Sequence, residues 1–159
     1  MKVKPQAAIL IALMIIISGI SVTSALGLWK TTATKTPAKL KDPQYSEAYN
    51  PADIRGSYTF SDLSKLYNIP IEDLSAAFGV DPAKASDFKC KDLESPNGSS
   101  QNKIGLTSIK LFVAYYLGLP YNPTEEIYLP EAAAKILLEK SSFTQGQRDY
   151  LKNHTIPKA

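Results

Sequence analysis

A run of uncharged, mostly apolar residues near the start of the chain restricts its structure more than any other feature. Residues 7–29, AAILIALMIIISGISVTSALGLW, contain no charged side chain. As a helix rising about 1.5 Å per residue, the run would extend for about 34 Å, and the hydrocarbon core of a bilayer is about 30 Å thick. Lys2 and Lys4 precede the run, and Trp29 and Lys30 close it with an interfacial ring and a charge. The pattern predicts a transmembrane anchor.

The same run also has the features of a secretory signal peptide, which are a basic start, an apolar centre and small residues after it. Cleavage would then fall near Ala25, with Thr23 and Ala25 as the small pair. The apolar character that continues beyond Ala25 favours a retained anchor. The basic N-terminus (1–6) favours an orientation with the N-terminus inside, so that the rest of the chain is exported.

The remainder of the chain divides by composition. Residues 30–50 are rich in Thr, Lys, Ala and Pro and show no apolar period, which is typical of a linker or stalk. Residues 51–156 form the predicted domain, in which the halves 51–94 and 104–156 are joined by a polar loop at 95–103. A domain of this size can bury a core without disulfides or metals.

Charge argues against a nucleic-acid partner. The formal net charge is +3, but residues 1–50 contain six lysines, and residues 51–96 carry eight acidic against five basic side chains. Residues 59–79 have the spacing of a helix-turn-helix. Their second helix nevertheless carries Glu72 and Asp73 where phosphate contacts would need Lys or Arg.

Helix signals are strong in the first half of the domain and strand signals are weak. Thr59 and Asp62 have the spacing of a capping box, and the helix that they open ends at 68–70, Asn-Ile-Pro. A second helix is predicted over 71–78 and a third over 88–93.

The second half contains the most apolar helix after the anchor, over 107–117. Because it is apolar almost all round, it is expected at the centre of the domain. A bend with several prolines follows at 119–129, then a helix over 130–139 and a last helix capped by Thr144. The predicted fold class is mainly α, with a transmembrane helix followed by one small domain of short helices.

Tyrosines gather around the bend. The central helix cannot bury both Tyr115 and Tyr116 in one direction, and Tyr121 and Tyr128 lie within the bend. Because tyrosine is favoured at interfaces, we predict that Tyr115, Tyr121 and Tyr128 form a partner surface. The alternative is that they are ordinary core and rim side chains.

No pattern predicts catalysis. The single histidine, His154, follows the last helix and suits its C-terminal dipole, and the single cysteine, Cys90, allows no disulfide or cysteine cluster. Cys90 is expected to be a packed apolar side chain, although Lys89 and Lys91 are neighbours of the kind that lowers a thiol pKa. We therefore expect no enzymatic activity, no cofactor and no metal.

Part of the chain follows a known pattern of an Ile-x-Gly opening, a Thr, an Ile-Pro step and a Leu. The matching residues are Ile54, Gly56, Thr59, Ile69, Pro70 and Leu74. On these positions, residues 53–156 resemble a small helical domain found in membrane proteins, often beside four-iron four-sulfur ferredoxin-type modules. The chain lacks the cysteines that bind such clusters. The resemblance therefore implies an accessory or docking part without the electron carrier, and it makes the matching positions structural.

The first half also resembles the lysin-motif fold, in which two short helices lie between two strands. Tyr58, Thr59 and Phe60 correspond to the first strand. Residues 81–93 are predicted to be helical, so no closing strand is expected. This resemblance implies binding to cell-wall glycan.

The sequence thus predicts a membrane-anchored, non-enzymatic interaction or accessory module on the outer side of the membrane. Its partners would be the bilayer, through residues 7–29, and a membrane protein, with a membrane redox complex as the assembly that the first resemblance implies. The alternative is a cell-wall glycan-binding module, which would also fit secretion after cleavage near Ala25.

Overall fold

The computed structural model describes Met14 and residues 36–94 and 104–157. The predicted anchor at 7–29 lies outside the described residues, except for Met14. None of the helices in the described part combines the length and the apolar character that crossing a bilayer requires.

The chain divides into two compact units, Met1–Lys35 and Thr36–Ala159. The second unit therefore starts within the stretch that composition marks as a stalk. Lys39 and Tyr49 form an antiparallel bridge there, and the Tyr49 ring meets the Tyr67 ring edge-on with 6.3 Å between centroids. These contacts join the end of the stretch to the helical domain.

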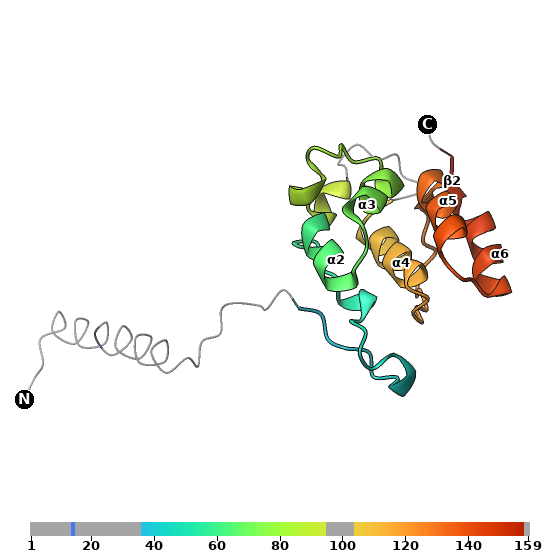
Figure 1. Ribbon diagram of the computed structural model, residues 1–159, viewed down its shortest axis with the longest axis horizontal. Helices are drawn as coiled ribbons and strands as arrows, with labels where there is room; N and C mark the ends of the chain where they lie inside the picture. Colours follow the sequence, from blue (N-terminus) through green and yellow to red (C-terminus); the bar gives the residue numbers. More distant parts are fainter. Residues whose placement is uncertain (1–13, 15–35, 95–103, 158–159) are drawn as a thin grey trace, which may run out of the picture. The chain divides into compact units, whose positions relative to one another are not determined.

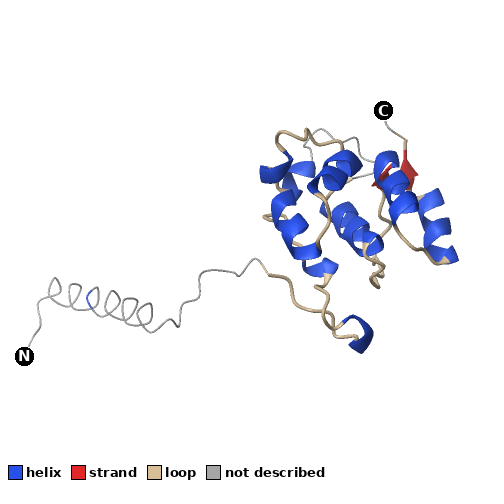
Figure 2. Ribbon diagram, viewed as in Figure 1, coloured by secondary structure: helices blue, strands red, loops and turns tan. Residues whose placement is uncertain are grey.

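The described part of the second unit is mainly helical, as the sequence predicts (Figures 1 and 2). Its α-helices are α2 (Phe60–Tyr67), α3 (Ile71–Phe78), α4 (Leu106–Tyr116), α5 (Glu131–Lys140) and α6 (Gln145–Asn153). Its 3₁₀ helices are η1 (Pro43–Tyr45), η2 (Pro51–Asp53), η3 (Ala85–Asp87) and η4 (Cys90–Leu93), and its strands are β1 (Leu129–Pro130) and β2 (Thr155–Ile156).

Local sequence signals set the bounds of α2 and α3. Thr59 and Asp62 form the predicted capping box, in which each side chain accepts a hydrogen bond from the backbone N–H of the other, at 3.0 and 3.1 Å. Asn68 ends α2 in the left-handed region with φ 52°, and Gly79 ends α3 with φ 66°. Left-handed residues of these types commonly terminate helices, so the predicted helices are confirmed here.

The predicted helix over 88–93 is wrong at its start. Phe88 is extended, and its carbonyl accepts a hydrogen bond from the Phe60 N–H at 3.0 Å, while the Cys90 N–H donates to the Tyr58 carbonyl at 2.8 Å. The segment thus returns antiparallel to the residues before α2. Pairing across about 30 residues overrides the local helix signal here, through an isolated bridge between Thr59 and Lys89 and without a strand in this described segment.

Gly56 allows this return to lie close. The Lys91 N–H donates to the Gly56 carbonyl at 3.0 Å, and a Cβ on Gly56 would lie 3.0 Å from the Lys91 Cβ. That distance is closer than side chains normally approach, so a larger residue would push the two segments apart.

Helix α4 lies at the centre of the domain, as predicted. Figure 1 shows it between α2 and α3 on one side and α5 and α6 on the other. Seven of its 11 residues are buried, on all sides of the helix. Phe112 meets the ring of Phe78 from α3 at 5.5 Å, and Leu111 and Val113 are fully buried.

The two strands were not predicted. β1 and β2 form a parallel pair at the C-terminal end of the domain, with Leu129 opposite Thr155 and Pro130 opposite Ile156 (Figure 2). Parallel strands need a crossover connection, and here α5 and α6 supply it. The pair therefore joins the start of α5 to the end of α6.

Replacing Thr59 tests whether its cap stabilises the first helix. Thr59→Ala should lower the free energy of unfolding by about 1 kcal/mol, because the Asp62 N–H loses its acceptor. Thr59→Ser keeps the hydroxyl and should stay near the parent chain. Urea denaturation followed by circular dichroism measures both, and equal midpoints for Thr59→Ala and the parent would contradict the assignment.

Candidate functional site

The bend between α4 and α5 is fixed at its ends and exposed in its middle. Leu119 and Ile127 are buried, whereas most of residues 120–126 are exposed. Ser108, buried in the first turn of α4, donates its hydroxyl to the Tyr128 carbonyl at 2.7 Å. The exposed part of the bend is thereby held between buried anchors.

Tyr115 and Tyr116 point in different directions, as the helix geometry requires. Tyr115 is only 5% exposed, and its ring packs edge-on against Phe143 with 6.0 Å between centroids. Tyr116 donates its hydroxyl to Asp73 of α3 at 2.7 Å. Tyr115 thus belongs to the core, and only Tyr121 and Tyr128 of the predicted tyrosine surface are partly exposed.

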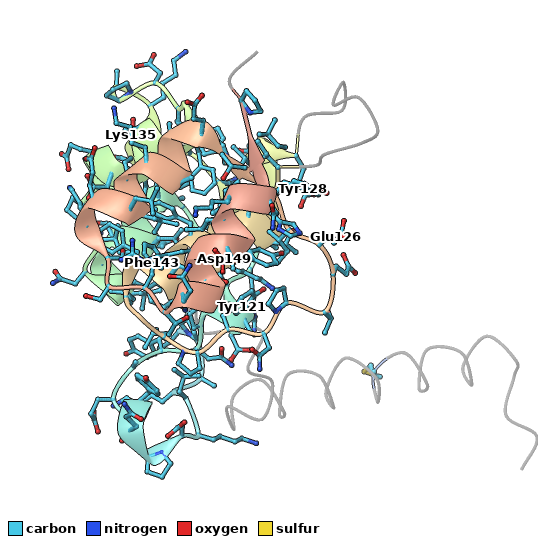
Figure 3. All side chains as sticks on the ribbon, turned by 90° about the vertical axis from the view of Figure 1, so that its right-hand side faces the viewer. Tyr121, Glu126, Tyr128, Lys135, Phe143 and Asp149 are labelled. Carbon is cyan, nitrogen blue, oxygen red and sulfur yellow. The ribbon has the colours of Figure 1, made fainter. Side chains whose placement is uncertain are left out.

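Tyr121 and Tyr128 lie at the two ends of the exposed bend. In Figure 3 the labelled Glu126 lies near Tyr128 and points away from the helices. The Tyr128 hydroxyl donates to the Glu126 carboxylate at 3.2 Å, and this bond raises the pKa of Tyr128. Burial raises the pKa of Tyr121, with a smaller contribution from Tyr150. Both phenols therefore remain protonated at neutral pH.

Tyr150 of α6 organises this region, although the sequence did not single it out. Its hydroxyl accepts a hydrogen bond from the Ile127 N–H at 2.9 Å and donates to the Ile127 carbonyl at 3.3 Å. Its ring stacks on His154 with 3.9 Å between centroids and 4° between planes. The Tyr128 ring also lies near His154, with 5.3 Å between their centroids. The spacing of Tyr150 and His154, one helical turn, was the only signal in the sequence.

A groove runs between α5 and α6, which lie side by side in Figures 1 and 3. It has a volume of about 430 Å³. Its lining comprises the apolar Ala134, Leu138 and Leu151, the charged Glu131, Lys135, Arg148 and Lys152, and the polar Gln145 and Thr155. Within each helix the lining residues recur at a spacing of three and four residues, so they lie on one face of that helix. Leu138 is 53% exposed, which is unusual for a large apolar side chain in this domain.

The groove is held at both ends. At one end the β1–β2 pair joins the start of α5 to the end of α6, and the Leu129 N–H donates to the His154 carbonyl at 2.9 Å. At the other end Arg148 lies 5.9 Å over the Phe143 ring, which itself packs on Tyr115 of the central helix. The two helices are therefore fixed relative to each other before any partner binds.

An ion pair fixes α5 to the rest of the domain. The Lys140 ammonium lies 2.7 Å from both carboxylate oxygens of Asp73, which also accepts the Tyr116 hydroxyl. Burial alone would raise the pKa of Asp73, but the hydrogen bonds from Lys140 and Tyr116 outweigh it, so this pKa is lowered. Burial and the bond to Asp73 raise the pKa of Tyr116 to about 12. Helices α3, α4 and α5 meet at this cluster.

The positions of the Ile-x-Gly pattern are placed in the core or at helix ends. Ile54, Ile69 and Leu74 are at most 1% exposed, and Pro70 directly precedes α3. With the cap at Thr59 and the close approach at Gly56, each matching residue has a local structural role.

Cys90 is fully buried, and burial raises the pKa of its thiol to about 12. The effect expected from Lys89 and Lys91 is therefore wrong, because both lysines are largely in solvent while the thiol is not. Within residues 36–94 and 104–157, the structure places no group of three or more His, Cys, Asp or Glu side chains that could hold a metal ion.

Comparison of the chain with family models, with curated proteins and with solved structures finds no match. The candidate site consists of the α5/α6 groove and the adjoining bend.

Removing the Tyr150 hydroxyl tests its role in holding the bend. Tyr150→Phe should lower the free energy of unfolding by about 1 kcal/mol, because the buried Ile127 N–H loses its acceptor. Tyr121→Phe is the matched control, since the Tyr121 hydroxyl forms no hydrogen bond in the described part of the chain, and it should change little. Equal losses for the two variants in urea denaturation would contradict this role.

Cys90 should be inert in the folded chain. At pH 8 a thiol-specific reagent should label it more than about a hundredfold more slowly than in concentrated urea, because the folded chain both covers the thiol and disfavours the thiolate. Labelling rates followed by mass spectrometry measure the ratio, and comparable rates in the two conditions would show an accessible thiol.

Proposed function

We propose that this chain is a membrane-anchored, non-enzymatic interaction module whose partner binds the α5/α6 groove and the adjoining bend. The observation that carries the proposal is the groove itself. It has an apolar floor, a large exposed leucine in Leu138 and walls that are held in place at both ends. A fixed surface of this kind loses little conformational freedom on binding, which favours recognition.

The chemistry-bearing side chains of the domain support a binding role over a catalytic one, because they have structural tasks. Cys90 is packed in the core, Ser108 holds the bend, and His154 is stacked on Tyr150. Asp73 joins three helices through Tyr116 and Lys140.

Placement at the outer side of the membrane rests on residues 7–29 and on the basic residues before them. The partner on this proposal is a membrane protein. A membrane redox complex is the assembly that the Ile-x-Gly pattern favours, and in that setting the domain would act as an accessory or docking part.

A second proposal, binding to cell-wall glycan, is favoured by one observation. The residues before α2 pair with residues 88–91 after α3, so two short helices lie between two paired segments, as in the lysin-motif fold. This function would use the first half of the domain and not the groove.

Site-specific photocrosslinking in intact cells separates the two proposals. A photoreactive amino acid replaces Leu138 in the groove of the full-length chain, and a second chain carries it in place of the exposed Asp81, after α3. We expect a discrete crosslinked membrane protein from position 138 and none from position 81.

The outcome that would contradict the interaction proposal is retention of the chain in the insoluble wall fraction, with no discrete product from position 138. Protease treatment of sealed cells tests the location in the same material. Digestion of the domain from outside is expected, and full protection would overturn the exported orientation.

A further inference from the structure

We propose that the α5/α6 groove binds an amphipathic helix whose apolar stripe is flanked by Asp and Glu side chains. The inference rests on the proposed interaction function and specifies the chemistry of the partner. It follows from the shape of the groove, from its charge, and from what the rest of this chain can and cannot supply.

The shape fits a helix. α5 contributes Ala134 and Leu138 to the floor and α6 contributes Leu151, so apolar side chains from two helices face one channel. The two helices run in opposite directions, because they are joined by a short loop at one end and by the β1–β2 pair at the other. Such a channel between two helices accepts the apolar stripe of a third, which is a recurrent mode of peptide recognition.

The charge of the rim selects the flanks of that third helix. Lys135 stands on the α5 side, Arg148 and Lys152 stand on the α6 side, and Glu131 is the one acidic residue of the lining. All three basic side chains are exposed, and none forms an ion pair within the described part of the chain. Basic groups on both walls complement carboxylates on both flanks of the ligand's stripe.

This chain does not itself supply the occupant. Its segments outside the described ranges, 1–13, 15–35, 95–103 and 158–159, contain lysines and no Asp or Glu. A second copy offers acidic side chains on α3, but the apolar face of α3 is already buried, with Leu74 and Ala77 inaccessible. These segments and α3 of a second copy are poor occupants, and we assign the helix to another protein.

A concave site also favours a helix over a bilayer surface. Anionic headgroups would satisfy Lys135, Arg148 and Lys152, but the groove is hollowed, and a flat surface follows such a hollow less closely than a protruding side chain does. The exposed half of Leu138 is the apolar surface that such a side chain would cover.

The test uses the full-length chain in phosphatidylcholine nanodiscs and a fluorescent peptide designed as an amphipathic helix with a Leu stripe flanked by Glu. A matched peptide carries Lys in place of Glu. Anisotropy titrations should show that the Glu peptide binds and the Lys peptide does not. Lys135→Glu with Lys152→Glu should weaken binding of the Glu peptide by about tenfold or more.

One control variant shows that the loss is local, and a second variant tests the apolar contact. Lys65→Glu with Lys84→Glu reverses two exposed charges on the other half of the domain and should leave the affinity unchanged. Leu138→Ser should weaken binding with only a small fall in the urea midpoint, because half of its surface is already in water.

Three results would overturn the proposal. These are equal binding of the two peptides, equal effects of the two charge reversals, and binding of the chain to phosphatidylserine vesicles through Lys135 and Lys152 with no binding of the Glu peptide. If the Glu peptide fails while position 138 still crosslinks to a membrane protein in cells, the acidic helix is wrong and the interaction function stands. If both fail, the interaction function fails as well.

Discussion

The burial of α4 on all sides is the constraint on which the rest of this domain depends. A helix that is apolar almost all round must be covered by other elements, and here they come from both halves of the domain. α2 and α3 cover one side through contacts such as the Phe78 ring on the Phe112 ring. α5 and the segments C-terminal to it lie on the other side. The C-terminal helix α6 remains on the outside, and its outer position leaves one of its faces open beside α5.

Helix α6, which carries that open face, is held in place by polar contacts more than by burial. In the described part of α6 only Leu151 is buried, yet the helix is tied down by the Tyr150 hydroxyl on the Ile127 backbone, by the β1–β2 pair and by Arg148 over Phe143. Each tie connects α6 to the bend or to a segment that packs on α4. Exposed apolar surface and fixed geometry therefore occur together in the groove, a combination that favours binding at low entropic cost.

Local signals in the sequence were enough to predict the helices with their own caps and stops. Thr59 with Asp62 and the left-handed end at Gly79 act over one turn, so α2 and α3 could be found without knowledge of the fold. The return of residues 88–91 and the β1–β2 pair could not, because their partners lie about 25 to 30 residues away and the pairing overrides local preference. The candidate site divides in the same way, between residues found from local signals and residues that depend on distant contacts. Tyr121 and Tyr128 were predicted from the bend, whereas Tyr150 and the groove depend on how α6 meets elements distant in sequence.

Helix α6 is a fixed wall of a preformed surface and not a loosely attached terminal helix. Native-state hydrogen exchange of the full-length chain, read amide by amide, tests it most directly. A fixed α6 should have its amides protected together with the Leu129 amide, and Tyr150→Phe should lower their protection while the amides of α4 keep theirs. Exchange of α6 at the rate of an unfolded peptide, with α4 still protected, would contradict the account, because the groove would then lack one of its walls before a partner arrives.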